Sequence, residues 1–214
     1  MASISDRPTP VRTPARVLRF TASERAFHWL VAVAFFVLFL SGLLMGTRGS
    51  LHNVLYAVHL ASGGVLVGGL ALIVLWGNRR ALSQSRRDLS TLDALDRQWL
   101  ARVPAAVFKR SPETAAGRFN AGQKLNFMLV TVLFAALFVT GIGLIVTGSH
   151  PVDPVFKAAH VVAAYTALVL VAGHLYMALI NPSTRPALRG MISGKVDAAW
   201  ARKYHTRPGD RDAT

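Results

Sequence analysis

Residues 156–180 read FKAAHVVAAYTALVLVAGHLYMALI, a continuous apolar run of about 25 residues that decides the fold. At about 1.5 Å per residue, a helix of this length crosses a bilayer core of roughly 30 Å. The run contains His160 and His174, 14 positions apart, so both lie on one helix face, about 21 Å apart along the axis. Ionisable residues inside a membrane are costly. Two of them on one face, at different depths, predict two stacked functional sites.

The whole chain has the composition of an integral membrane protein. It has 214 residues, of which 52% are hydrophobic. Apolar runs long enough to cross a membrane recur along it. Together with the fourth run at 156–180, we expect spans at about 26–45, 54–76 and 124–146. The predicted fold is therefore all-α, a four-helix bundle embedded in a membrane.

The charge and the lack of cysteine exclude several kinds of cofactor site and indicate the orientation in the membrane. The chain has no cysteine, which excludes disulfides, thiolate metal sites and cysteine-ligated iron–sulfur clusters. Its net charge of +14 would suit a nucleic-acid partner, but basic residues also gather in the cytoplasmic loops of membrane proteins. Of 24 Lys and Arg residues, 22 fall on one side of the predicted spans, and the exceptions are Arg48 and Lys157. We expect both termini in the cytoplasm, a bacterial inner-membrane location and no nucleic-acid partner.

The chain divides into three parts on this interpretation. Residues 1–20 form a mostly disordered cytoplasmic arm, residues 21–180 form the four-span domain, and residues 181–214 form a basic cytoplasmic tail. Thr21 and Glu24 have the spacing of a capping box at the first helix. No internal repeat is apparent. The polar connection between the second and third spans carries apolar residues at helical spacing, which predicts a helix at the membrane surface; they are Leu89, Leu92, Leu95, Trp99, Leu100 and Val103.

The predicted topology sorts four histidines into two pairs by depth. His28 and His174 lie near the cytoplasmic ends of their spans, whereas His59 and His160 lie near the outer ends. Haem iron takes two axial imidazoles, and four-helix bundles hold porphyrins between facing helices. Zinc would need three or four ligands at one depth. The pattern predicts two non-covalent haem b groups, each with two histidine ligands.

Other interpretations of these residues remain open. A histidine in a span also serves as a hydrogen-bonded packing residue or as a proton relay. Glycines near the predicted ligands would let a flat macrocycle approach the backbone, but glycines also serve helix packing; they are Gly42, Gly63, Gly64 and Gly173. The remaining histidines lack a depth-matched partner, and we expect them at the surface; they are His52, His150 and His205.

Several segments resemble the membrane cytochrome b (gamma) subunit of respiratory formate dehydrogenase. They are RFTASERAFHW at 19–29, RFNAGQKLNF at 118–127, HVVAAYTALVLVAGHLYMA at 160–178 and GMISGKVDAAWARKYH at 190–205. The resemblance implies four spans and two b haems. The haem ligands that it implies are His28, His59, His160 and His174. It also implies a site for menaquinone or ubiquinone on the cytoplasmic side, formed by Asn120, Gly122 and Gln123. The first outer link is shorter here than in familiar members.

The resemblance also implies partners. These are an iron–sulfur beta subunit, which supplies electrons, and a molybdenum- or tungsten-containing alpha subunit, which oxidises formate. The chain would pass electrons from the outer haem to the inner haem and then to quinone. It would thus be an enzyme only as the electron-transfer and quinone-reducing subunit of that complex. The alternatives are a cytochrome b of another quinone-linked dehydrogenase, such as nickel–iron hydrogenase, and a haem-free membrane anchor.

Two sets of polar residues near the cytoplasmic side have more than one interpretation. The amides of Asn120 and Gln123 can hydrogen-bond a quinone carbonyl, but Asn120 can also simply cap the third span. Arg19 and Arg25 lie near the depth of the inner haem. They can pair with haem propionates, or they can form a solvated basic flank.

Overall fold

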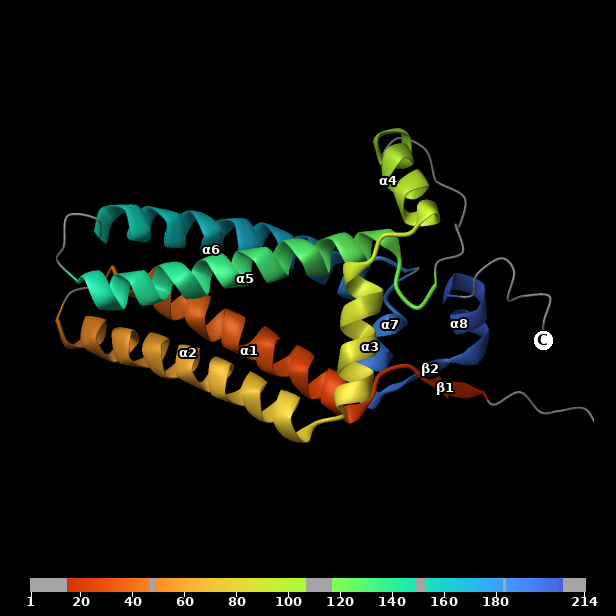
Figure 1. The fold of residues 1–214 in the computed structure, drawn as a ribbon, viewed down its shortest axis with the longest axis horizontal. Helices are drawn as coiled ribbons and strands as arrows, with labels where there is room; N and C mark the ends of the chain where they lie inside the picture. The colour runs from red at the N-terminus through yellow and green to blue at the C-terminus, as the bar shows by residue number, and fades with distance from the viewer. Residues whose placement is uncertain (1–14, 47–48, 107–116, 149–152, 183, 206–214) are drawn as a thin grey trace, which may run out of the picture.

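The computed structural model describes residues 15–46, 49–106, 117–148, 153–182 and 184–205. Its body is a bundle of four long helices that lie along the longest axis of the molecule (Figure 1). They are α1 (Ala22–Leu44), α2 (Ser50–Trp76), α5 (Ala121–Thr147) and α6 (Asp153–Leu175), the last continued by a short π-helical segment, η1 (Tyr176–Ile180). All four are long and apolar enough to cross a membrane. The predicted all-α bundle is confirmed, whereas the side on which the termini lie stays a prediction.

The four long helices form two hairpins. The backbones come within 8 Å of one another chiefly inside each hairpin, α1 against α2 and α5 against α6. Between the hairpins, aromatic side chains make the contact. Phe35 of α1 packs against Phe134 of α5, with ring centroids 6.3 Å apart, and Phe39 meets Tyr165 of α6 edge-on at 5.8 Å. An aromatic layer thus joins the hairpins near the middle of the bundle.

Each long helix begins three or four residues before the apolar run that predicted it. In α1 and α5 the extra turn contains a side-chain cap, whereas α2 begins without one. Thr21 and Glu24 form the expected capping box at α1, and Asn120 and Gln123 form a second one at α5. A cap satisfies the free backbone N–H groups of the first turn. Hydropathy alone therefore sets the start of these helices too late.

The short elements all gather at one end of the bundle (Figure 1). They are β1 (Arg16–Leu18), α3 (Arg79–Ser90), α4 (Ala94–Ala106), α7 (Ala187–Ser193), β2 (Lys195–Asp197) and α8 (Ala198–His205). We call this end the sheet end. The opposite end, where α1 is followed by α2 and α5 by α6, is the link end.

The connection between the second and third spans forms two helices rather than the single surface helix expected. The side chain of Asp93 accepts a hydrogen bond from the backbone N–H of Asp96, so α4 starts afresh from its own cap. Helix α3 lies across the sheet end of the bundle and packs on α5 (Figure 1). Helix α4 is joined to α5 by a buried ion pair between Asp96 and Lys124. The side chains of Trp99 and Val103 lie outside the described residues.

The segments before and after the bundle meet in a small antiparallel sheet. Strand β1 pairs with β2, with Val17 opposite Val196, so residues 16–18 are not part of a disordered arm. The carbonyl of Gly194, at a left-handed φ of 82°, accepts hydrogen bonds from the backbone N–H groups of Arg19 and Phe20. Residues 1–14 and 206–214, the rest of the expected arm and tail, lie outside the described residues.

Two short segments of the first hairpin recur in the second hairpin at a common offset, a similarity that the sequence analysis did not note. The segment RFT at 19–21 and the segment RFN at 118–120 lie 99 positions apart, and Ser41-Gly42 and Thr140-Gly141 have the same offset. The repeated arginines lie side by side: Arg19 donates to the carbonyl of Arg118 (2.5 Å), and Arg118 donates to that of Arg19 (3.1 Å). The matching residues lie only at the start of the first helix of each hairpin and in one later turn of that helix. The apolar residues between them differ, so the similarity is difficult to detect in the sequence.

Candidate cofactor sites at two depths of the bundle

The structure brings the four predicted histidines together in two pairs. His28 of α1 faces His174 of α6, with ring centroids 6.0 Å apart. His59 of α2 faces His160 of α6, with ring centroids 6.2 Å apart. The first pair lies toward the sheet end and the second toward the link end, as the helix directions require. Each pair joins one hairpin to the other.

The 6.2 Å spacing matches that of two imidazoles on opposite sides of one metal ion, and the 6.0 Å spacing is slightly shorter. A histidine nitrogen lies about 2.0–2.1 Å from a bound metal and about 1.1 Å from its own ring centre, so two axial rings have centres about 6.2–6.4 Å apart. Among the described residues, no group of three or more His, Asp or Glu side chains could hold a metal ion. A porphyrin would supply the remaining ligands of an iron ion held by either pair.

Hydroxyl groups support both rings of the link-end pair. Ser41 Oγ lies 3.0 Å from His59 Nδ1, and Thr140 Oγ1 lies 2.9 Å from His160 Nδ1. These contacts come from the helix that precedes each histidine in its own hairpin, α1 for His59 and α5 for His160. Their effect is to occupy Nδ1 of each ring, which leaves Nε2 as the nitrogen for a ligand bond.

The glycines at this site let the rings pack close to the neighbouring helix. A Cβ on Gly42 would lie 3.4 Å from His59 Cε1, and one on Gly141 would lie 3.5 Å from His160 Cε1. The other glycines expected near the ligands face open space, because a Cβ there would meet no atom within 4 Å; they are Gly63, Gly64 and Gly173. No side chain therefore fills the space next to these glycines on α2 and α6.

Helix α7 lies beside His28, one member of the sheet-end pair. The ring of Trp29 meets His28 edge-on at 5.4 Å, and its Nε1 donates a 3.0 Å hydrogen bond to the carbonyl of Met191. Arg25 donates to the neighbouring carbonyl of Ile192 at 3.1 Å. Trp29 and Arg25 therefore hold α7 against the start of α1, beside His28.

Arg19 is half-buried rather than part of a solvated flank. Its guanidinium lies over the rings of Phe20 and Trp200. Burial and the neighbouring charge of Arg118 lower the pKa of Arg19 to about 10, so it stays cationic at neutral pH. The two arginines tolerate this proximity because Arg118 also pairs with the buried carboxylate of Glu24 at 2.5 Å.

Asn120 and Gln123, the expected quinone contacts, cap α5. Asn120 Oδ1 accepts from the N–H of Gln123 at 2.8 Å, and Gln123 Oε1 accepts from the N–H of Asn120 at 3.0 Å. The capping alternative is therefore what the structure shows. Each amide still has its NH₂ group, which can donate to a ligand. Both residues are half-buried at the sheet end, as is Gly122.

A family model described as prokaryotic cytochrome b561 matches residues 19–194. The chain belongs to this family. The match covers all four long helices and both histidine pairs. Haem b is the cofactor that the family implies, and the spacing of the two pairs fits it.

Curated relatives of this cytochrome b561 family member share about a quarter of its residues. The formate dehydrogenase cytochrome b556(fdo) subunit of Escherichia coli K12 is 26% identical over 198 residues, 89% of this chain and 90% of the relative. The nitrate-inducible cytochrome b556(Fdn) subunit of the same strain is 26% identical over 210 residues, 89% of each chain. A formate dehydrogenase cytochrome b556 subunit of Haemophilus influenzae is 25% identical over 218 residues, 92% of this chain and 84% of the relative. The resemblance noted from the sequence is confirmed.

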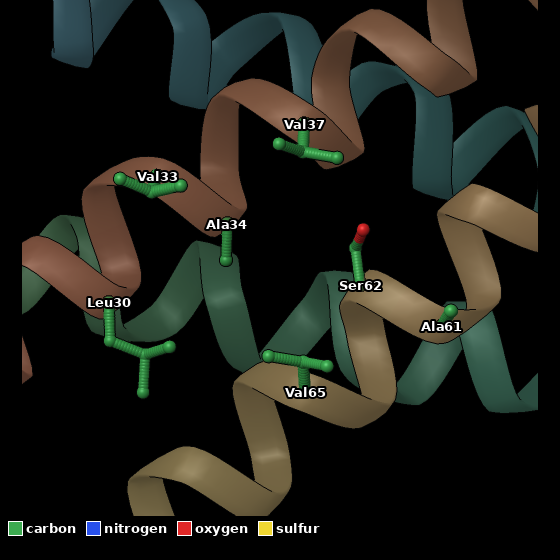
Figure 2. Close-up of a pocket in the computed structure, with 7 residues that line it drawn as sticks. All are labelled: Leu30, Val33, Ala34, Val37, Ala61, Ser62 and Val65. Carbon is green, nitrogen blue, oxygen red and sulfur yellow. The ribbon is translucent and has the colours of Figure 1, made fainter.

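A hollow in this cytochrome lies within the first hairpin. It has a volume of about 260 Å³ and opens between α1 and α2 (Figure 2). Its lining is apolar apart from one hydroxyl; the residues are Leu30, Val33, Ala34, Val37, Ala61, Ser62 and Val65. All of them come from a single hairpin and none is titratable; Leu30 and Ser62 lie two and three positions after His28 and His59.

The sequence analysis missed three residues of the link-end site: Ser41, Thr140 and Gly141. The signal that would have found them is the common offset of 99 positions between Ser41-Gly42 and Thr140-Gly141. Of the unpaired histidines, His52 is exposed with its Nδ1 2.8 Å from the carbonyl of Met45. His150 and the side chain of His205 lie outside the described residues.

Proposed function

We propose that this cytochrome b561 family member carries two haem b groups and is the membrane subunit of a formate dehydrogenase. The proposal rests on two pairs of facing histidines, one pair toward each end of the bundle. The ring centres are 6.0 Å apart in the sheet-end pair and 6.2 Å apart in the link-end pair. The names of the relatives in Escherichia coli and Haemophilus influenzae support the assignment to formate dehydrogenase.

The chain's own residues would divide the work by depth. His59 and His160 would hold one haem, supported by Ser41 and Thr140, and His28 and His174 would hold the other. Haem b, when bound, supplies a carrier of one electron at each site. His160 and His174 lie about 21 Å apart along α6. The aromatic contacts of Phe35 and Phe39 lie between the two sites along the bundle.

We place the sheet end in the cytoplasm. The described Lys and Arg residues gather there, and Lys157 is the described one nearest the link end. Basic residues accumulate on the cytoplasmic side of membrane proteins. The link end would then face outward in a bacterial inner membrane, and electrons would travel inward.

Quinone reduction would take place at the sheet end, beside the start of α5. The capping box uses the oxygens of Asn120 and Gln123 and leaves their NH₂ groups to donate to a carbonyl of menaquinone or ubiquinone. Gly122, between them, presents no side chain that would obstruct the approach. Protons for the reduction would then come from the cytoplasm.

Formate oxidation itself would belong to partner subunits. An iron–sulfur beta subunit would deliver electrons at the link end, to the site of His59 and His160, and a molybdenum- or tungsten-containing alpha subunit would oxidise formate. This chain has no cysteine with which to hold an iron–sulfur cluster.

Optical spectra of membranes that contain the assembled complex test this function. We expect formate to reduce b-type haem bands and a quinone analogue to reoxidise them. The same membranes should then be supplied with hydrogen in place of formate. Reduction by hydrogen but not by formate would overturn the assignment to formate dehydrogenase in favour of a hydrogenase partner, and a preparation without haem bands would overturn the haem sites altogether.

A further inference from the structure

The link-end histidines differ from the sheet-end histidines in how their rings are held. Ser41 Oγ and Thr140 Oγ1 lie 3.0 and 2.9 Å from the Nδ1 atoms of His59 and His160. Within the part of the chain that the structure describes, the rings of His28 and His174 have no such hydroxyl partner. The two candidate haem sites therefore do not have equivalent surroundings.

The direction of these hydrogen bonds follows from the other bonds of each hydroxyl. Ser41 Oγ lies 2.7 Å from the carbonyl of Val37, and Thr140 Oγ1 lies 2.6 Å from that of Ala136. A hydroxyl has a single proton, and a carbonyl can only accept. Each hydroxyl thus donates to its own helix backbone and accepts from the ring, so Nδ1 of each histidine carries the proton. With the proton on Nδ1, the lone pair of Nε2 is free to bind a metal.

The common offset of 99 positions shows that this arrangement occurs twice rather than once by accident. Ser41 and Thr140 lie 99 positions apart, and each is followed by a glycine that admits the imidazole edge. His59 and His160 are 101 positions apart, close to the same offset. His28 has Phe127 at the equivalent position, so the sheet-end pair falls outside this similarity.

We propose that Ser41 and Thr140 are positioning residues that fix the tautomer and orientation of His59 and His160 and lower the reduction potential of the link-end haem relative to the same site without them. The proposal rests on the haem sites of the proposed function. A hydrogen bond from Nδ1–H raises the basicity of the ligating nitrogen, which stabilises ferric over ferrous iron. Deleting a hydroxyl should therefore raise the potential of this haem alone.

The test is a redox titration of the b-haem bands in membranes that carry the intact complex. The variants are Ser41→Ala and Thr140→Val, which remove the hydroxyls, and Thr140→Ser, which keeps one. Thr131→Val is the matched control, because Thr131 lies on the same helix and bonds to the carbonyl of Phe127, not to a histidine. We expect one of the two midpoints to rise in the first two variants and to stay at the wild-type value in the others. A tenfold change in the preference for ferric iron would be a shift of about 59 mV.

Unchanged midpoints in both Ser41→Ala and Thr140→Val would overturn the proposal, as would an equal shift in Thr131→Val. If a variant loses haem, the haem content of the variants tests the positioning role instead. Loss of haem in Thr140→Val with retention in Thr140→Ser supports that role. Equal loss of haem in Thr131→Val contradicts it. The wild-type protein separates this proposal from the proposed function. If the wild-type protein contains two haems but their midpoint potentials do not respond to the substitutions, only the positioning role is refuted. If the wild-type protein contains fewer than two haems, the haem sites themselves are refuted.

Discussion

Arg19 and Arg118, 99 positions apart, donate hydrogen bonds to each other's backbone carbonyl. The reciprocal contact joins the residues that precede α1 and α5, the first helix of each hairpin. Arg118 completes it by pairing with Glu24, whose side chain is 7% exposed. Arg118 thus ties the two hairpins together at the sheet end, where α3 also packs on both of them.

Replacing Arg118 by Gln should destabilise the bundle markedly. The change leaves the buried carboxylate of Glu24 without its cationic partner, and breaking a buried ion pair in this way costs roughly 3 kcal/mol. Thermal unfolding of the purified protein in detergent measures the effect. Arg87→Gln on α3 is the matched control, since Arg87 is exposed and its side chain makes no ion pair in the described structure. Equal unfolding temperatures for the two variants would contradict the role given to Arg118.

The sequence predicted the bundle and the histidine pairs because both depend on strong, periodic signals. Apolar runs the length of a bilayer leave little choice of fold, and the spacing of His160 and His174 on one helix places two sites at two depths. The pairing with His28 and His59 then follows from the direction of each span. These inferences need no knowledge of side-chain contacts.

What the sequence did not predict depends on contacts between distant segments. The strand pair of Val17 with Val196 joins two short segments that have no periodic signal of their own. Ser41 and Thr140 looked like ordinary small polar residues within apolar spans, and only the structure shows that each meets a histidine on the next helix. The break between α3 and α4 depends on one local cap, Asp93, within a segment of otherwise uniform helical spacing.

Replacing Asn120 by Ser separates its two roles. A serine hydroxyl can still accept from the N–H of Gln123 and cap α5, but it lacks the amide NH₂ that we assign to quinone. A lost neutral hydrogen bond is worth about 0.5–1.5 kcal/mol, so reoxidation of formate-reduced haem by a quinone analogue should slow by a few-fold to about tenfold. Asn78→Ser is the control, because Asn78 caps α3 through the same kind of bond to Ala81. Unchanged reoxidation in Asn120→Ser would remove Asn120 from the quinone site.

Reporter fusions test the orientation of the bundle. A reporter that is active only outside the cytoplasm should be silent when fused after Thr214 and active when inserted near Ser50, at the link end. The reason is the concentration of Lys and Arg toward the sheet end. The reverse pattern would place His59 and His160 on the cytoplasmic side and would reverse the proposed direction of electron flow.

The haem content per chain tests the central claim most directly. It is measured by the pyridine haemochrome assay on purified wild-type protein and on the single variants His160→Ala and His28→Ala. The account predicts about two haems in the wild type and about one in each variant, because each replacement removes a ligand from one pair and leaves the other pair intact. One haem or none in the wild type, or loss of both haems on replacing His28 alone in a protein that still folds, would contradict two independent sites.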